Sequence, residues 1–156
     1  MEIFGTIVKF LSDAGIEFRT VHHEPTLTSE ASARARGEDL SVGGKAIVMK
    51  VDEEFRLFVL SAALKLDSQR IKQRFNAKKL RFATPEELMT LTGLVPGSVP
   101  PFGKPLLPLD LYVDSSIVNN EKIAFNAGSL SDSIIMNTQD YLSAAKPEQF
   151  EFSKKE

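Results

Sequence analysis

The spacing of hydrophobic positions predicts a chain of short helices and strands in alternation. Over residues 2–14, apolar side chains recur every three or four positions, as in a helix that buries one face. Alternating or continuous apolar runs rich in β-branched residues predict strands instead. The predicted helices span residues 2–14, 29–36, 66–75, 85–92 and 140–145, and the predicted strands span residues 16–21, 45–51, 55–62, 79–82, 109–113, 117–118, 122–125 and 133–137.

Two of the predicted helices begin with recognisable capping residues. Thr84 can accept a hydrogen bond from the backbone N–H of Glu87, whose carboxylate can reach back, and Pro85 occupies the first helical position. Thr28 can cap the helix over 29–36. Short helices interleaved with short strands indicate an α+β, or mixed α/β, domain.

An irregular segment, residues 93–108, lies between two predicted elements. It holds five of the eight prolines and three of the nine glycines of the chain. Proline restricts φ and glycine allows close approach of the backbone to a ligand, so we expect a stiff loop. Loops of this length in a small domain are often functional. The loop either presents backbone N–H and C=O groups to a ligand or covers one edge of the core, and composition favours neither.

Length and composition exclude several classes of protein. The 156 residues, 42% hydrophobic and 26% charged, fit one globular domain. The sequence has no cysteine and only two histidines, so it excludes thiol nucleophiles and cysteine zinc sites, and we expect no metal. No apolar run approaches the roughly 20 residues of a membrane span, and the N-terminus lacks the features of a signal peptide. We therefore expect a cytoplasmic protein.

Charge is distributed unevenly along the chain. The net charge of -2 argues against a generally basic nucleic-acid binder. Residues 65–81 nevertheless carry +6, and the rest of the chain carries -8. A basic run of this kind is ordinarily a solvated helix face. It is also the pattern expected of a contact to a phosphate backbone.

Lys45 is a candidate for chemistry because it follows Gly43-Gly44 and opens a predicted buried strand. An ammonium at that place could donate hydrogen bonds to a phosphate or a carbonyl. The sequence alone favours the alternative, a lysine whose stem covers the core and whose ammonium lies in water. Lys50 lies on the opposite face of the strand by parity. The run His22–Glu24 lacks the further partner that general-base chemistry would need, which favours a structural role.

Five segments of the chain, in this order and spacing, match the motifs of a known family. They are HHEPTLTSEA (22–31), GGKAIVMKV (43–51), LKLDSQRIKQRF (64–75), ATPEELMTLTGLVPGSVPPFG (83–103) and FNAGSLSDSIIM (125–136). With them the chain resembles the YbaK/ProX-type aminoacyl-tRNA editing domains, relatives of the insertion domain of bacterial prolyl-tRNA synthetases. The resemblance covers roughly residues 1–145 and leaves 146–156 as a polar C-terminal tail. It implies a single domain with a central, mostly antiparallel sheet or partial barrel and flanking helices.

The resemblance implies a trans-acting deacylase. Its substrate would be tRNA(Pro), or a related tRNA, carrying a wrong small amino acid on its 3′ end. Synthetases separate small side chains poorly, because one methylene is worth only about 1–3 kcal/mol, and a second pocket removes their errors. The family uses no protein nucleophile, metal or cofactor; water or a ribose hydroxyl of the substrate does the chemistry.

The resemblance also implies roles for particular positions. Lys45 is the candidate catalytic residue, which positions the tRNA terminus or the ester. The candidate substrate-binding residues are the G-x-x-x-P stretch Gly97, Ser98, Val99, Pro100 and Pro101, together with Leu27, Thr28, Ser61 and Gly128. The candidate tRNA-binding residues, which would meet the acceptor stem, are Arg70, Lys72, Arg74, Lys78 and Lys79.

One departure from the family concerns specificity. Some alanine-specific relatives carry a histidine near the closing turn, where this chain has Asn126-Ala127-Gly128-Ser129. The resemblance therefore does not imply alanyl-tRNA(Pro) specificity, and esters of cysteine, serine, threonine, alanine and proline all stay open.

Two other functions stay open beside the deacylase. A non-catalytic module of the same fold would bind tRNA, or an aminoacyl-tRNA synthetase, without turnover. An enzyme unrelated to tRNA would act on a soluble ester, and its substrate affinity would be insensitive to salt, whereas a phosphate contact weakens as salt rises.

Overall fold

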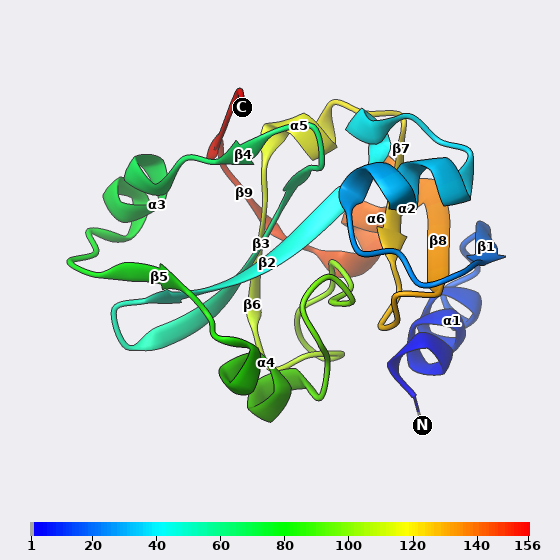
Figure 1. Cartoon of the computed structure of the whole chain (residues 1–156), viewed down its shortest axis with the longest axis horizontal. Helices are drawn as coiled ribbons and strands as arrows, with labels where there is room; N and C mark the ends of the chain where they lie inside the picture. The colour runs from blue at the N-terminus through cyan, green and yellow to red at the C-terminus, as the bar shows by residue number, and fades with distance from the viewer. Residues whose placement is uncertain (1) are drawn as a thin grey trace.

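A five-stranded mixed sheet forms the centre of the computed structural model, which describes residues 2–156 (Figure 1). Its strand order is β5-β2-β3-β6-β9. Strands β5, β2 and β3 are antiparallel neighbours, and β6 and β9 join in parallel. The strands are β2 (Gly44–Val51), β3 (Glu54–Ser61), β5 (Leu80–Phe82), β6 (Asp110–Val113) and β9 (Glu148–Gln149).

Two smaller antiparallel sheets complete the framework. One has the order β1-β8-β7, with β1 (Phe18–His22), β7 (Lys122–Asn126) and β8 (Asp132–Asn137). The other pairs β4 (Lys65–Leu66) with β10 (Ser153–Lys154). A single bridge between Gly43 and Ala124 joins the first small sheet to the start of β2. The sheets do not close into a barrel, and the mixed α/β class predicted from the sequence is confirmed.

Six α-helices and one 3₁₀ turn flank the sheets in the described part of the chain. The N-cap predicted for α2 is confirmed, since Thr28 accepts a hydrogen bond from the backbone N–H of Ala31 at 3.1 Å. The helices are α1 (Ile3–Asp13), α2 (Ser29–Arg36), α3 (Ser68–Phe75), α4 (Pro85–Thr92), α5 (Ser115–Val118) and α6 (Thr138–Ala145), with the 3₁₀ turn η1 over Leu40–Val42.

Two details of the predicted pattern are wrong. Residues 117–118, predicted as a strand, lie in α5 because the Asp114 carboxylate accepts a hydrogen bond from the Ser116 backbone N–H and starts a helical turn. The helix predicted over 66–75 begins two residues later, with Asp67 as its N-cap. In both places a short aspartate side chain decides the backbone conformation, which apolar spacing alone does not reveal.

The central sheet separates two hydrophobic cores. Successive side chains of a strand point to opposite faces, and β3 is apolar on both. Leu57 and Val59 belong to the larger core, which α1, the loop over 93–108 and the small sheet complete. Phe58 and Leu60 belong to the smaller core beneath α3. Both faces of β3 are therefore covered by protein.

The C-terminal segment packs on the smaller core. Phe152 is fully buried, with its ring 5.4 Å from that of Phe58. The backbone N–H of Phe152 donates to Oδ1 of Asp114 at 2.6 Å, and the Ser153 hydroxyl donates to Oδ2 at 2.7 Å. Residues 146–156, which composition describes only as polar, thus supply β9, β10 and part of a core.

The predicted capping box at the start of α4 is present. Thr84 Oγ1 accepts from the Glu87 backbone N–H at 3.1 Å, and Glu87 Oε1 accepts from the Thr84 backbone N–H at 2.9 Å. Arg81 adds two hydrogen bonds to the same carboxylate, at 2.7 and 2.9 Å. The bonds from Arg81 first, and from Thr84 second, lower the pKa of Glu87 from 4.5 to about 2.

Glu87 should make the stability of the fold sensitive to acid. The pKa of Glu87 is lower in the folded chain than in the unfolded chain. The contribution of Glu87 to the free energy of unfolding is therefore complete above pH 4.5 and is lost as the pH falls toward about 2. We expect Glu87→Gln to be less stable than the wild type at neutral pH and equally stable near the bottom of that window, as measured by urea unfolding at a series of pH values. Glu86→Gln, at the exposed neighbour, should follow the wild type throughout. A constant difference between wild type and Glu87→Gln at every pH would contradict the prediction.

Candidate functional site

A pocket of about 240 Å³ opens between α2, the start of β2 and the irregular loop. The segment around α2 forms one wall and the first residues of β2 form the second. The irregular loop over 93–108 and the turn after β7 together form the third wall. The lining residues are Thr26, Leu27, Thr28, Ser29, Ser32 and Arg36; Gly43 to Ile47 and Ala62; and Pro96, Gly97, Val99, Asn126 and Leu130.

The pocket brings together predicted site residues from three separate parts of the sequence. Lys45 lines it from β2, and Leu27 and Thr28 line it from the N-terminal end of α2. Gly97 and Val99 line it from the irregular loop. Residues more than fifty positions apart in the sequence therefore share one cavity, as the family resemblance implies they should.

Other predicted residues of the loop lie behind the pocket wall. Ser98, Pro100 and Pro101 are buried and are not lining residues. The Ser98 hydroxyl donates to the Val95 carbonyl at 2.8 Å, and the Tyr141 hydroxyl donates to the Pro101 carbonyl at 2.6 Å. These contacts hold the loop against the larger core.

Ser61 and Gly128 also lie outside the lining. The Ser61 hydroxyl donates to the Ser41 carbonyl at 2.9 Å, and its neighbour Ala62 reaches the pocket instead. Gly128 has φ +85°, and a Cβ there would lie 1.7 Å from a methyl carbon of Ile3. Its N–H donates to the Ser98 carbonyl at 2.9 Å, so only glycine lets this turn support the loop.

The loop presents two backbone donors at the pocket. Gly97 adopts φ +87°, a conformation that favours glycine. The backbone N–H groups of Gly97 and Val99 make no hydrogen bond to any residue between 2 and 156. Pro96 and Pro100 have no N–H to offer. These two lining residues therefore have backbone donors that are free to bind a ligand oxygen at this wall.

Lys45 is the pocket residue best placed to donate from the opposite wall. Its side chain is 27% exposed, and Nζ lies 3.9 Å from Oε1 of Glu156. Burial lowers the pKa of Lys45, and the charges of Glu156 and Glu30 partly offset this. An amine donates hydrogen bonds in either protonation state, so Lys45 can hold a ligand oxygen across the pH range in which it titrates.

Arg36 and Asn126 are pocket residues that the sequence analysis missed. Arg36 is only 8% exposed; its Nε donates to Ser133 Oγ at 2.9 Å and its Nη2 to Asn126 Oδ1 at 3.0 Å. Burial lowers its pKa to about 10, against the opposing effect of the Glu38 charge. An arginine in the last turn of a polar helix is ordinarily a solvated partner of the helix dipole. The one available signal was the spacing of positions 29, 32 and 36, which share a helix face.

Asn126 connects two walls of the pocket. Its Oδ1 accepts from Arg36 of α2, and its Nδ2 donates to the Gly97 carbonyl of the loop at 2.8 Å. His23 supports this arrangement from behind, with Nδ1 2.8 Å from the Glu24 carbonyl and Nε2 2.8 Å from Ser133 Oγ. Because a carbonyl oxygen only accepts, Nδ1 carries the proton, and His23 has the structural role favoured by the sequence.

The candidate tRNA-binding residues do not line the pocket. In Figure 1, α3 and β5 lie to the left of β2, whereas α2 lies to its right. Arg70 pairs with Asp67 and Glu151 at 3.4 and 3.0 Å. Lys72, Lys78 and Lys79 make no ion pair with the described residues.

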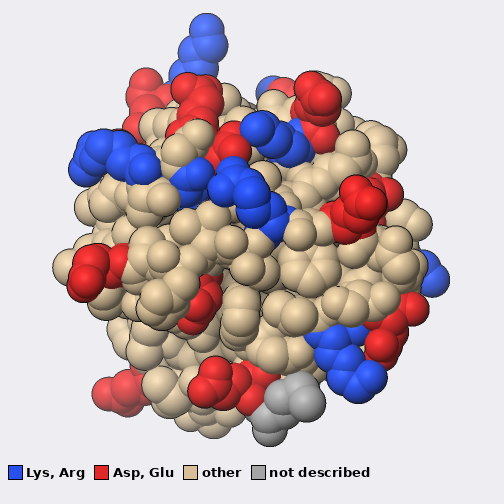
Figure 2. Space-filling model, turned by 90° about the vertical axis from the view of Figure 1, so that its right-hand side faces the viewer, with Lys and Arg blue, Asp and Glu red and all other residues tan. Residues whose placement is uncertain are grey.

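Figure 2, which faces the side of the molecule with β1 and α1, shows further basic side chains in a band with acidic ones around it.

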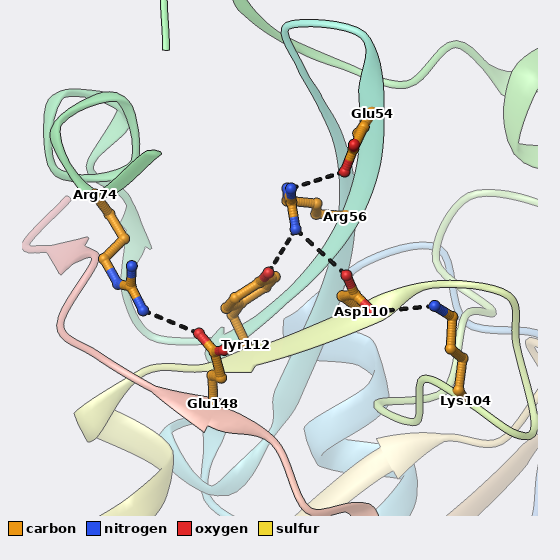
Figure 3. Close-up of polar contacts among 7 residues, drawn as sticks. All are labelled: Glu54, Arg56, Arg74, Lys104, Asp110, Tyr112 and Glu148. Carbon is orange, nitrogen blue, oxygen red and sulfur yellow. Dashed lines mark hydrogen bonds and ion pairs between the residues drawn. The ribbon is translucent and has the colours of Figure 1, made fainter. Parts of the chain in front are cut away.

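Arg74 belongs to a polar and aromatic cluster over the smaller core (Figure 3). Its Nη2 lies 3.0 Å from Glu148 Oε2, and its guanidinium lies 5.7 Å from the centre of the Phe75 ring. The guanidinium of Arg56 lies over the same ring, 4.6 Å from its centre. It also donates a hydrogen bond to the Tyr112 hydroxyl at 2.6 Å. Glu54, Asp110 and Lys104 complete the cluster. Part of the basic charge predicted for tRNA is therefore engaged in fastening α3 to the sheet.

Residues 2–156 contain neither a cluster suited to a metal ion nor a helix suited to a membrane. No group of three or more His, Asp or Glu side chains is arranged to hold a metal ion. No helix is long and apolar enough to cross a membrane.

Comparison with known proteins places these observations in a family. The model of the aminoacyl-tRNA editing domain matches residues 23–144. The chain is 36% identical over 154 residues to the multifunctional Ser/Thr-tRNA deacylase ProXp-y of Escherichia coli (strain K12), covering 95% of this chain and 91% of that protein. It is 35% identical over 100 residues to the proline–tRNA ligase of Shouchella clausii (strain KSM-K16), covering 64% of this chain and 17% of the ligase.

The fold has solved counterparts. A crystal structure described as a candidate trans-editing enzyme for prolyl-tRNA synthetase superimposes with a TM-score of 0.85 at 23% identity, covering 99% of this chain and 98% of that one. The crystal structure of the hypothetical protein APE2540 has a TM-score of 0.84 at 20% identity, covering 95% and 99%. At these identities the likeness establishes the fold.

Asn126→Asp tests whether Asn126 holds the loop. The substitution keeps an oxygen for Arg36 but removes the donor to the Gly97 carbonyl. One hydrogen bond is worth about 1 kcal/mol, so we expect the Ser98 and Gly128 amides to exchange with deuterium about fivefold faster. Asn119→Asp, at the exposed C-terminal end of α5, should leave both amides unchanged. Unchanged exchange at Ser98 and Gly128 in Asn126→Asp would show that the loop is held by other contacts.

Proposed function

The chain belongs to the aminoacyl-tRNA editing domain family and is an aminoacyl-tRNA hydrolase, and from that premise we propose that it removes a wrong small amino acid from a tRNA in trans. The tRNA we propose is tRNA(Pro) or a related tRNA, because proline–tRNA ligases contain a similar segment. The observation that carries the proposal is the pocket itself, whose lining brings Lys45 of β2 together with Gly97 and Val99 of the irregular loop.

The volume of the pocket favours a small acyl group. About 240 Å³ accommodates an aminoacyl ester and part of the terminal ribose, whereas drug-sized ligands occupy pockets of roughly 300–1,000 Å³. The curated relative ProXp-y is named for seryl and threonyl deacylation, which also concerns small side chains. A second pocket of this size would release wrongly attached amino acids that a synthetase cannot distinguish from the correct one when the two differ by a single methylene.

Water attacks the ester carbonyl in the proposed reaction. The new C–O bond produces a tetrahedral oxyanion, and the bond to the ribose oxygen then breaks, leaving a free amino acid and a ribose hydroxyl that has taken up a proton. The N–H groups of Gly97 and Val99 would stabilise the oxyanion, as fixed backbone donors do in other acyl-transfer sites. Lys45 would hold the ester or the terminal phosphate. The lining includes no histidine, carboxylate or cysteine, so the proposed proton acceptor is solvent or the neighbouring ribose hydroxyl.

Deacylation assays with Lys45→Ala test the proposal. The panel contains one tRNA(Pro) body charged with cysteine, serine, threonine, alanine or proline. We expect wild type to release at least one amino acid, and Lys45→Ala to lower kcat/KM on it by about 100-fold, the loss that follows when a substrate is misplaced by about 1 Å. Lys50→Ala is the matched control, since Lys50 has the same 27% side-chain exposure on the other face of β2. It should retain activity.

Failure would take two distinguishable forms. If no charged tRNA is hydrolysed above background but tRNA or a synthetase binds, the chain is the non-catalytic module instead. If Lys45→Ala and Lys50→Ala lose the same activity, Lys45 has no special role in the reaction.

We propose further that the unpaired lysines near α3 contact tRNA phosphates. Replacing two phosphate-binding cations should lower the slope of log affinity against log salt by about 2. We expect this of Lys72→Ala/Lys78→Ala, measured by filter binding at several salt concentrations. Lys9→Ala/Lys122→Ala removes the same charge from ion-paired lysines of α1 and β7 and should leave the slope unchanged. Equal slopes for the two double variants would overturn this assignment.

A further inference from the structure

One aromatic side chain of the central sheet lies in solvent. Phe82, the last residue of β5, is 60% exposed, and it is the only aromatic residue among the large apolar side chains that are exposed in residues 2–156. Single exposed apolar side chains are common and need no function. The argument for a function of Phe82 is its place between the pocket and a group of unpaired lysines.

The strand register places Phe82 on the same face of the sheet as Lys45. Phe82 pairs with Met49 of β2, and directly opposed residues of neighbouring strands lie on the same side. Residues 45, 47 and 49 of one strand also share a side. Met49 is buried in the smaller core, and Ile47 packs against that core and lines the pocket together with Lys45. A stripe therefore runs along this face from Lys45 through Ile47 to Phe82.

Strand β5 leaves the pocket end of β2 open. It pairs only with residues 49–51. After one further hydrogen bond, from the Ala83 N–H to the Val48 carbonyl at 2.9 Å, the chain turns away into α4. Residues 44–47 all line the pocket, and β5 pairs with none of them. Phe82 thus lies where β5 ends and the pocket-lining part of β2 begins.

The other end of the stripe carries unpaired cations. Lys78 and Lys79 precede β5, and their backbone N–H groups both donate to Oδ1 of Asp52 at 2.9 Å, which fixes them beside the turn after β2. Both side chains are exposed, and neither forms an ion pair within residues 2–156. Sites for single-stranded nucleic acid combine these two features, since cations follow the phosphates and bases stack on aromatic rings.

The length of the stripe fits the unpaired 3′ end of a tRNA. Four residues of β2 lead from Lys45 to Met49, the partner of Phe82, and a strand rises about 3.3 Å per residue, so the span is about 13 Å. Stacked nucleotides rise about 3.4 Å each, so about four of them cover this span, and an unstacked strand needs fewer. A strand whose terminal ester lies in the pocket would therefore bring one of its last few bases to Phe82.

We infer that Phe82 is a stacking platform for an unpaired base near the 3′ end of the tRNA, and that the backbone of this end follows β2 and β5 from the pocket toward Lys78 and Lys79. Every base has a π-face, so this contact adds affinity without selecting a sequence. The inference rests on the proposed deacylase function, which puts the terminal ester in the pocket, and adds the surface that holds the rest of the 3′ end.

Binding of an uncharged RNA hairpin tests the inference. The hairpin consists of the tRNA(Pro) acceptor stem with its unpaired 3′ end, and its affinity is measured by fluorescence anisotropy. We expect Phe82→Ala to weaken binding about tenfold, the order of magnitude of one lost base–aromatic stack. Phe82→Tyr, which keeps a ring, should bind like wild type, and Phe82→Leu, which keeps only apolar bulk, should bind like Phe82→Ala. Met89→Ala, at an exposed apolar position of α4, is the matched control and should not change the affinity.

Hairpins that lack one base identify the stacked nucleotide. An abasic nucleotide is placed in turn at each position of the unpaired 3′ end. Wild type should bind one of these hairpins about tenfold more weakly than the intact one, whereas Phe82→Ala should bind both alike, because the ring and the base act as a pair. The inference is wrong if Phe82→Ala binds the intact hairpin like wild type, or if each abasic nucleotide weakens binding to both proteins by the same factor.

Salt dependence and self-association separate stacking from other contacts. Phe82→Ala should keep the slope of log affinity against log salt, because the substitution removes no charge, whereas loss of a phosphate-binding lysine lowers that slope. If Phe82→Ala instead converts a dimer to a monomer in sedimentation and leaves the RNA affinity unchanged, the exposed ring serves a contact between copies of the chain and the inference is overturned.

The uncharged hairpin also separates this inference from the proposed function. If wild type hydrolyses no charged tRNA but the loss at Phe82 and the loss at one base coincide, the stacking platform stands and the deacylase is rejected. If wild type deacylates tRNA while Phe82→Ala has unchanged hairpin affinity and unchanged kcat/KM, the stacking platform is rejected and the deacylase stands.

Discussion

The geometry of the pocket depends on one side chain, Asn126, which joins α2 to the irregular loop. Its amide accepts from the buried Arg36 and donates to the Gly97 carbonyl, so two walls from distant parts of the chain are fixed at one separation. The proline-rich composition of the loop reduces its freedom but cannot by itself set where it lies. A misplacement of about 1 Å in a binding site can cost about a hundredfold in rate, so the separation set by this link bears on what the cavity of about 240 Å³ can do.

The sequence predicts most of the framework because local signals and packing agree there. The helices that start at Thr28 and Thr84 and the hairpin of β2 and β3 follow from capping and from the period of apolar residues. Local sequence made Lys45 and the proline-rich loop candidates, and the family motif supplied the roles predicted for Lys45, Gly97 and Val99. Arg36 was missed because its burial is produced by contacts with Ser133 and Asn126, about ninety residues further along the chain. Spacing within a helix shows which side chains share a face, but not what that face meets.

The central sheet divides the molecule into a core that carries the pocket and a core that carries α3. The larger core carries the pocket, whose lining comes from α2, β2 and the loop. The smaller core carries α3, whose cations partly serve to fasten it, as the ion pair of Arg74 with Glu148 does. Strands β2, β3 and β6 contribute side chains to both. Substitutions that change acyl preference can therefore accumulate on one side without repacking the other, because contacts that share no partners have nearly additive effects.

Burial of Phe152 also bears on the order in which the chain is completed during synthesis. Every lining residue of the pocket precedes residue 131, so the cavity has all of its parts before the last strands have been made. The smaller core does not, because the Phe152 ring that packs on Phe58 arrives almost a hundred residues later. On the ribosome the nascent chain would thus carry an apolar face beneath α3 that stays uncovered until the final residues emerge. The C-terminal segment acts as a late closing element, and truncating it would leave that apolar surface permanently exposed to aggregation.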